Sequence, residues 1–478
     1  MDITPHILLV LMIIPFLGFL FVLMTKNNKV QNRHNAIATA EFAIVCNILL
    51  LGKLLTKLNL SQTGMQFFAT YQWIEQPHIS ITFGIDVFSL MIALAAHLML
   101  LICLPFAQDS ARPKLLVGLS LLMLSLLTGF VLSVDIFSFY VFFTAMLFPL
   151  FVLIGTVGEI KKSSWMFRFF IYNFLGCIVL FLVVCALYHY RSQTGGILLE
   201  KVAGIRLPRP YEYWIWGGIF AALLSRIPIW PFHYWIASVT GAVQNPLVFL
   251  LVNLMPLTGV YGLVRFCPKA VPESVSYMLT GLEIIAAISM VFIAMIGLIN
   301  KDNRYKLFSF MTVYYIIFLL GALLPTSRIL LNIGYSIFAF LIIVTVLEVL
   351  ASYIRREQQY RNLNFYGILC QSPRLSLLYS FFTLAAVGFP LSALFINNFV
   401  IVSYLFRYNF NMGLVIMFAI IVSSASLLKE LYVLKDNRYV HPGSVCIADI
   451  SQTMFWGLVG IAVLLLVSFF NPLLVVGG

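Results

Sequence analysis

Ionisable side chains that interrupt long apolar stretches are the residues of this sequence most suited to chemistry. Five lie within or beside hydrophobic runs: His97, Arg226, His233, Glu283 and Glu348. An ionisable residue inside a membrane normally marks an ion or proton pathway, because burial brings the pKa values of groups such as Glu and Lys toward neutrality. Arginine stays protonated and supplies a fixed charge instead. These five residues are therefore a candidate polar pathway.

Each of these residues also has a structural interpretation. Glu283 lies near the outer end of its run and Glu348 near the cytoplasmic end of its own, so both could reach the membrane interface. His97 stands among Ala and Leu, which is typical of a packed, hydrogen-bonded histidine. Arg226 could pair with an unidentified acid or line a water-filled pocket, and His233 could cap a helix. The sequence leaves these alternatives open.

The elements that position these residues are predicted to be membrane-spanning helices. Hydrophobic residues make up 62% of the 478 positions and charged residues only 10%, against roughly 25% in soluble domains. The apolar runs are continuous and often near the ~20 residues that a helix needs to cross a bilayer. A membrane barrel would alternate apolar and polar residues instead. The predicted fold is an all-α polytopic membrane protein.

About fourteen spans of suitable length follow one another, and the polar segments 57–83 and 189–212 are predicted as loops on the outer side. Asp86 and Asp135 stand where two spans begin, and an acid at a helix N-terminus is favourable, so both are interpreted as structural. The predicted spans are 4–24, 36–56, 84–106, 115–133, 136–156, 167–188, 213–232, 242–265, 278–299, 306–324, 328–353, 376–403, 410–432 and 455–474.

Helix-breaking residues concentrate in two places. One runs from Pro228 and Pro231 through Pro246 and Pro256, and the other is Gly388-Phe389-Pro390, roughly 160 residues after the start of the first. Interrupted helices in corresponding halves are typical of inverted-repeat transporters. We therefore expect interrupted seventh and twelfth helices in a single membrane domain, 1–478. Its predicted parts are N-terminal helices (1–114), a first repeat (115–265), a second repeat (278–432) and a C-terminal helix (455–474).

Charge and cysteine usage narrow the partners and cofactors. Loops after odd-numbered spans hold sixteen Lys and Arg residues and the other loops hold eight, which places both termini on the non-cytoplasmic side. The net charge of +12 therefore reflects membrane orientation, and no nucleic-acid partner is expected. The seven cysteines form no CxxC pair and are interpreted as small buried hydrophobic residues. We expect no metal and no cofactor.

Several motifs occur in a characteristic order. Gly84-Ile85-Asp86 precedes "FSL", and residues 135–155 read "DIFSFYVFFTAMLFPLFVLIG". "RFFIYNFLG" at 168–176 and "RIPIWPFHYWI" at 226–236 follow, then "VYGLVRF" at 260–266, Asp302 at the tenth span and "GFPLSALFINNF" at 388–399. Together they resemble the antiporter-like membrane subunits of respiratory complex I, most closely the chain M type. The same superfamily includes subunits of multisubunit cation/proton antiporters.

The resemblance implies fourteen helices with two inverted five-helix repeats, and proton conduction along a midplane chain of ionisable side chains. This sequence departs from the family at those very side chains. The family's fifth-span Glu, seventh-span Lys, eighth-span Lys, eleventh-span His and twelfth-span Glu align with Thr144, Arg226, Leu257, Phe338 and Asn398. None of the five replacements exchanges protons near neutral pH. The family's activity is therefore in doubt for this chain.

Three functions compete. The first is a membrane subunit of a complex I-like NADH:quinone oxidoreductase assembly, degenerate or non-pumping. The second is a subunit of a multisubunit cation/proton antiporter or another ion-transport assembly. The third, a membrane enzyme acting on lipid-linked substrates, is disfavoured because the outer loops lack acidic or His-rich clusters. We expect no catalytic site on this chain, other membrane subunits and the bilayer as partners, and a bacterial inner-membrane location.

Overall fold

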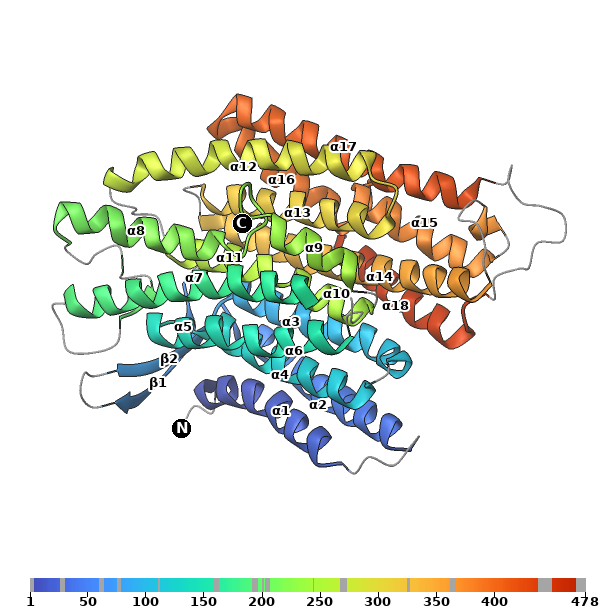
Figure 1. Cartoon of the computed structure of the whole chain (residues 1–478), viewed down its shortest axis with the longest axis horizontal. Coiled ribbons are helices and arrows are strands. Elements are labelled where there is room, and N and C mark those ends of the chain that lie inside the picture. Colours follow the sequence, from blue (N-terminus) through green and yellow to red (C-terminus); the bar gives the residue numbers. More distant parts are fainter. Residues whose placement is uncertain are drawn as a thin grey trace. The chain divides into compact units, whose positions relative to one another are not determined.

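Helices account for most of the chain in the computed structural model (Figure 1). The chain forms two compact units: Met1–Ser289 with Tyr315–Gly334, and Met290–Tyr314 with Tyr335–Gly478. The structure describes residues 4–25, 31–59, 64–74, 79–110, 112–157, 163–190, 197–199, 202, 207–243, 245–266, 273–324, 327–361, 367–370, 372–436 and 449–469.

The first unit is built mainly from the helices that precede residue 290. Within it α1 packs against α2 and α4, and α7 packs against α8 and α9 (Figure 1). Its elements are α1 (Thr4–Met24), α2 (Gln31–Lys57), α3 (Val87–Cys103), η1 (Leu104–Asp109), α4 (Pro113–Leu132), α5 (Ile136–Ala145), α6 (Leu147–Val157), α7 (Ser163–Tyr190), α8 (Arg209–Leu224), α9 (Tyr234–Ala242), α10 (Pro246–Asn253), α11 (Met255–Phe266) and most of α12 (Glu273–Ile299).

The second unit contains the C-terminal helices. Within it α17 packs against α15 and α16, and α18 packs against the same two helices. Its elements are the first part of α13 (Asn303–Ala322), most of α14 (Ser327–Arg361), η4 (Ile368–Cys370), α15 (Pro373–Val387), α16 (Ala393–Tyr408), α17 (Phe410–Lys435) and α18 (Gln452–Phe469).

A β-hairpin lies where the sequence predicted only a polar loop. Strand β1 (Gln66–Ile74) pairs antiparallel with β2 (Ile79–Ile85), and Tyr71 stands opposite Ile81. The loop prediction for 57–83 is wrong over these strands. Each strand is far shorter than the ~20 apolar residues that mark a membrane span, so a search for long apolar runs passes over its aromatic and alternating residues.

The predicted helix caps are confirmed. The Asp86 carboxylate accepts a hydrogen bond from the Ser89 amide (2.8 Å), and the Ser89 hydroxyl oxygen accepts one from the Asp86 amide (2.9 Å). These two bonds form a capping box at the start of α3. Asp135 accepts from the Ser138 amide at the start of α5 (2.8 Å). Burial raises the pKa of the Asp135 carboxyl, although its hydrogen bonds with Ser138 and Thr82 oppose that effect. Both aspartates therefore set where spans begin.

The two predicted helix interruptions are also present. Helix α8 ends at Leu224 and α9 begins at Tyr234, with non-helical backbone between them. Helix α15 ends on Gly388, whose φ of +81° suits a residue without a side chain. Ser392 then caps α16. Two further interruptions lie at Met146 between α5 and α6, three residues before Pro149, and at Leu254 between α10 and α11, two residues before Pro256. Pro256 was counted among the helix-breaking residues, but the spans 136–156 and 242–265 were predicted as continuous.

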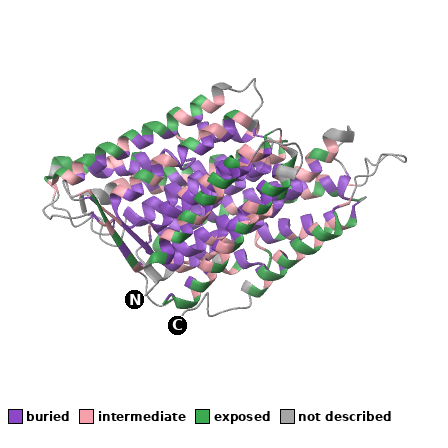
Figure 2. Cartoon of the chain, turned by 90° about the horizontal axis from the view of Figure 1, so that it is seen from below, coloured by how far each residue is buried: buried purple, intermediate pink, exposed green. Residues whose placement is uncertain are grey.

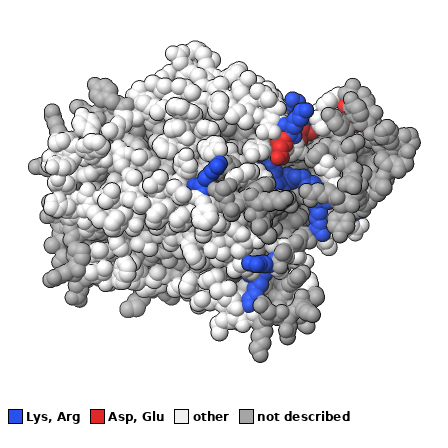
Figure 3. Space-filling model, viewed as in Figure 1, with Lys and Arg blue, Asp and Glu red and all other residues white. Residues whose placement is uncertain are grey.

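The described helices suit a membrane. Eleven are long and apolar enough to cross one; the interrupted pairs α8/α9 and α15/α16, with α18, make the arrangement compatible with fourteen spans. Buried residues gather on inward helix faces (Figure 2), whereas outward faces expose large apolar side chains such as Phe42 and Trp214. The face in Figure 3 is mostly uncharged. Such a surface requires a lipid environment.

Candidate functional site

Three helix interruptions of the first unit converge on Arg226. This residue lies in the non-helical segment between α8 and α9. Its side chain reaches Phe143, three residues before the interruption at Met146, and Met255, which follows the interruption at Leu254. Backbone carbonyls near a helix interruption lack their usual intrahelical donors. The interruptions therefore supply acceptors at the depth where Arg226 is held.

The guanidinium of Arg226 is fully buried, at 0% exposure, and several neutral groups hold it. Nη2 donates to the carbonyl oxygen of Phe143, and the guanidinium carbon lies 3.4 Å from the centroid of the Phe143 ring. Nη1 donates to the Thr258 hydroxyl (3.0 Å) and approaches the Met255 sulfur (3.8 Å). On the α7 side, the Cys177 sulfur lies 4.0 Å from Nη2.

Within the described part of the chain, no carboxylate lies within ion-pair distance of Arg226. Dipoles and one aromatic face compensate the charge, the latter through a cation–π contact. The compensation is incomplete, because Nε of Arg226 and the hydroxyl of Thr144 are buried without a hydrogen-bond partner. An ion-pair partner for Arg226, one of the structural alternatives considered above, is thus absent from the described residues. The side chain is a fixed positive charge packed against residues beside the helix interruptions at Met146 and Leu254.

Arg265, in the last turn of α11, has the partner that Arg226 lacks. Its two terminal nitrogens donate to the two oxygens of Asp86, each at 2.7 Å. The guanidinium also lies 4.8 Å from the centroid of Tyr261 and 5.6 Å from that of Phe88. The Ser89 amide donates to the same carboxylate (2.8 Å), so each oxygen of the buried Asp86 has at least one donor.

A second group of buried charges lies in the second unit. Glu348 on α14 is 0% exposed and forms an ion pair with Arg355, seven residues later on the same helix. The suggestion that Glu348 reaches the interface is therefore wrong, because the ion pair lets it stay inside. Glu430 on α17, which the sequence analysis did not single out, accepts a hydrogen bond from Tyr379 of α15 (2.5 Å). In the sequence, Glu430 stands beside Lys429 near a helix end, which is typical of a residue at the membrane interface.

Known proteins resemble this chain over most of its length. The family model described as "NADH:quinone oxidoreductase/Mrp antiporter, TM" matches residues 133–423, which is more than half of the chain. The chain belongs to this family. It is 27% identical to NADH-quinone oxidoreductase subunit M of Rhodobacter capsulatus, over 82% of this chain and 78% of that protein. It is 24% identical to NADH-ubiquinone oxidoreductase chain 4 of Chondrus crispus, over 95% and 92%.

Solved structures share the fold. A chain of respiratory complex I from Thermus thermophilus superimposes with a TM-score of 0.80 at 21% identity, covering 97% of this chain and 96% of that one. The membrane-bound sulfane sulfur reductase, an archaeal respiratory complex, gives 0.83 at 16% identity, covering 97% and 94%. The Mrp complex from Dietzia sp. DQ12-45-1b gives 0.79 at 16% identity, covering 99% and 96%. The predicted family and antiporter-like helical fold are confirmed.

The structure brings together three of the five positions aligned with the family's channel residues. Thr144 follows Phe143, Arg226 lies against Phe143, and Leu257 is buried beside Thr258 in the first turn of α11. In this group only Arg226 carries a charge, and arginine does not release its proton near neutral pH. The site therefore retains the family's position but not a titrating side chain.

The other two aligned positions lie in the second unit. The Asn398 amide donates to the Tyr314 hydroxyl (2.8 Å), and the Tyr314 ring stacks on Phe340 with centroids 5.0 Å apart. Phe338, on α14, is half-buried. Asn398 lies on α16, whose start is capped by Ser392. Neither an amide nor a phenyl ring exchanges protons near neutral pH.

His97 belongs to a closed hydrogen-bond network in the first unit. Its Nδ1 lies 2.7 Å from the Ala93 carbonyl and its Nε2 lies 3.0 Å from the Asn47 amide nitrogen, which also donates to the Leu11 carbonyl (2.8 Å). A neutral ring that donates from Nδ1 and accepts at Nε2 satisfies every one of these contacts. The structural interpretation of His97 fits this geometry, and the network joins α1, α2 and α3.

The remaining pathway candidates occupy less enclosed positions. His233 immediately precedes α9, is half-buried, and makes no capping hydrogen bond through its side chain. Glu283 lies on α12 and is also half-buried. His97, Arg226 and Glu348 have separate partners, so the contacts described above do not join them into one wire. The five-residue pathway stays a prediction.

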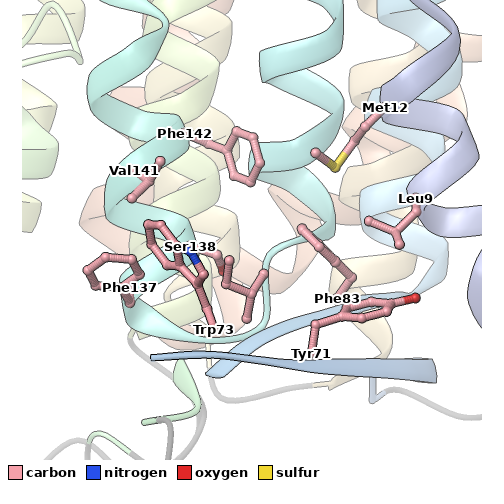
Figure 4. A pocket seen from close by; sticks show the side chains of 10 residues that line it. Leu9, Met12, Tyr71, Trp73, Phe83, Phe137, Ser138, Val141 and Phe142 are labelled. Carbon is pink, nitrogen blue, oxygen red and sulfur yellow. The ribbon is translucent and has the colours of Figure 1, made fainter. Parts of the chain in front are cut away.

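A pocket of about 300 Å³ lies between the β-hairpin, α1 and α5 (Figure 4). Aromatic rings dominate its wall, with Trp73 and Phe137 5.5 Å apart and Phe83 and Phe142 6.2 Å apart. The Ser138 hydroxyl donates to Asp135 (2.6 Å) and is thus already engaged. A mostly apolar wall of this kind suits hydrocarbon.

Proposed function

We propose that this chain is a membrane subunit of a complex I-like NADH:quinone oxidoreductase assembly. We further propose that the site around Arg226, in the first unit, does not exchange protons. The relatives named subunit M and chain 4 support the assembly, because the similarity spans 78% and 92% of those proteins. The observation that carries the second part is the buried Arg226, held by neutral groups where the family has a titrating lysine.

The physical reason concerns the charge itself. A proton relay needs a group that is protonated at one moment and deprotonated at the next. Arginine, with a pKa above ~12, keeps its proton, and Thr144 and Leu257 have none to exchange near neutral pH. The fixed charge of Arg226 would instead hold α5, α7 and α11 around the interruption between α8 and α9. We infer a packing role for this half of the subunit.

The second candidate is a subunit of a multisubunit cation/proton antiporter. The Mrp complex shares the fold over 99% of this chain, and the family description includes Mrp antiporters. A fixed positive charge at Arg226 is unfavourable for a cation that would pass this site. That electrostatic argument makes the complex I-like assembly the better supported of the two.

The experiment is purification of the full-length chain from its native membrane in a mild detergent, followed by mass spectrometry of what co-purifies. Co-purification with the quinone-reductase subunits is the expected result. Co-purification with a small set of antiporter subunits would favour the second candidate. Purification of the chain alone, with those subunits intact in the same membrane, would contradict both assemblies.

Orientation and internal division belong to the same proposal. We place the chain in a bacterial inner membrane with both termini on the non-cytoplasmic side, which the sixteen-to-eight distribution of basic loop residues supports. Single cysteines at positions 2 and 476, labelled in intact cells with a membrane-impermeant maleimide, test it. Labelling of both supports the orientation. The repeats at 115–265 and 278–432 stay a prediction.

A further inference from the structure

The proposed function leaves one buried cluster of ionisable groups unused. It lies wholly within the second unit and contains two carboxylates, Glu348 on α14 and Glu430 on α17, which are 0% and 4% exposed. Charged and titratable groups on the surrounding helices act on the pair: Asp302, Arg304 and Lys306 near or on α13, Arg355 on α14 and Tyr379 on α15. Lys429 on α17 acts on Lys306.

The Glu348 carboxylate is only half satisfied. Its Oε1 accepts from Nη2 of Arg355, whereas its Oε2 is buried and has no hydrogen-bond partner among the described residues. A buried ionised oxygen without a donor is costly. A proton bound at Oε2 would neutralise that oxygen, so the geometry provides an acceptor position that no group of the described residues fills.

The Glu430 carboxylate is joined to a hydroxyl. Tyr379 donates to its Oε1 at 2.5 Å, a short distance for such a bond. The ammonium group of Lys306, which is 5% exposed, acts electrostatically on the same carboxylate, as does Glu348 itself. A tyrosine hydroxyl both donates and accepts hydrogen bonds. Tyr379 can therefore reorient as the proton occupancy of Glu430 changes.

We propose that Glu348 and Glu430 form one shared proton-exchange site in the second unit, with Arg304, Lys306 and Arg355 compensating the charge that remains. In the exchange, a proton adds to a carboxylate lone pair to form an O–H bond, and the same bond breaks on release. Three nearby basic groups disfavour a metal cation there, so the exchanged species is a proton. The inference deepens the proposed function. The site itself is argued from the contacts above, and only the physiological role of the exchange rests on the proposed function.

The test is an infrared titration of the full-length chain in lipid nanodiscs. As the pH falls from about 9 to about 5, a carboxylic-acid carbonyl band should grow, and it should shift in deuterated water. Glu348→Gln and Glu430→Gln should each reduce or displace this band. Glu41→Gln, a half-buried glutamate on α2 in the first unit, is the matched control and should leave the band in place.

A purely structural ion network gives a different spectrum. If neither glutamine variant alters the titrating band, the proposal is wrong. Tyr379→Phe covers the case in which the glutamine variants do not fold, because it removes only the hydroxyl that bonds Glu430. It should shift the carbonyl frequency, and an unchanged spectrum would overturn the shared site. The isolated chain is measured, so failure here is distinct from failure to co-purify with an assembly.

Discussion

Arg226 and Arg265 are both buried in the first unit, and α11 contacts or carries both, yet their charges are stabilised in opposite ways. Arg265 forms a bidentate ion pair with Asp86, at 2.7 Å for each contact. Arg226 has backbone, hydroxyl, sulfur and ring neighbours but no described carboxylate. The first arrangement is a matched pair of charges, and the second is a single charge held by dipoles.

The difference separates two roles that the same residue type can have. A matched pair fixes two helices to each other, here α3 to α11, and either partner is harmful alone. A single buried charge contributes a field and occupies space, and its removal leaves neutral acceptors behind. The comparison predicts that the pair is the stability element of this unit, whereas Arg226 mainly fills the site where the family has a proton carrier.

Removal of the paired arginine should have the largest effect. Arg265→Met leaves the Asp86 carboxylate buried and unpaired, which should lower the free energy of unfolding by about 3–5 kcal/mol. Thermal unfolding of the purified chain in detergent measures it. The double variant Asp86→Asn with Arg265→Met should recover much of the loss, and a double variant as unstable as the single one would argue against the ion pair as the cause.

Removal of the unpaired arginine, Arg226, should lower the free energy of unfolding by less. Arg226→Met takes away a charge and leaves only the Phe143 carbonyl and the Thr258 hydroxyl without their donor, for a loss of about 1–3 kcal/mol. The same unfolding assay compares the two arginine variants directly. An Arg226→Met loss larger than that of Arg265→Met would reverse the comparison and point to an acidic partner outside the described residues.

Loss of one hydrogen bond beside the ion pair should have a smaller effect. The Tyr261 hydroxyl donates to the Val131 carbonyl at 2.5 Å, while its ring faces Arg265. Tyr261→Phe keeps the ring and removes the hydroxyl, so unfolding should become easier by about 0.5–1.5 kcal/mol. A loss as large as that of Arg265→Met would mean that the tyrosine, rather than Asp86, holds the arginine.

Restoring a carboxylate beside Arg226 should change stability least. In Thr144→Glu, attraction to Arg226 offsets the cost of burying the new carboxylate, and the net change should stay within about 1 kcal/mol. Thr144→Gln, which has the same size without the charge, is the control. Equal stability of both variants would show that the new carboxylate does not pair with Arg226.

Much of the fold could be predicted because its signals are local. Pro228, Pro231 and Gly388 marked the interrupted helices, and Asp86 and Asp135 marked helix starts. The hairpin at 66–85 was missed because its aromatic and aliphatic runs are too short to register as membrane spans. The interruptions at Met146 and Leu254 were missed although Pro149 and Pro256 follow them closely, because the apolar runs 136–156 and 242–265 were each interpreted as one continuous span.

The site was less predictable because its partners are distant in sequence. Asp86 was identified as a cap, but its ion pair joins residues 179 positions apart. The Phe143 carbonyl that holds Arg226 is a backbone atom, which no residue type reveals. Glu430 was hidden because a charge near a helix end normally reaches water, and only the fold shows that α15 encloses it.

Proton translocation by the intact native assembly carrying Arg226→Met tests the central claim most directly. The rate is measured in membrane vesicles with a pH-sensitive dye and divided by the amount of assembled complex. A fixed structural charge predicts the same rate per complex as the wild-type chain gives. Loss of translocation while the amount of complex and its quinone-reductase activity stay normal would contradict the account, because Arg226 would then belong to a working proton path.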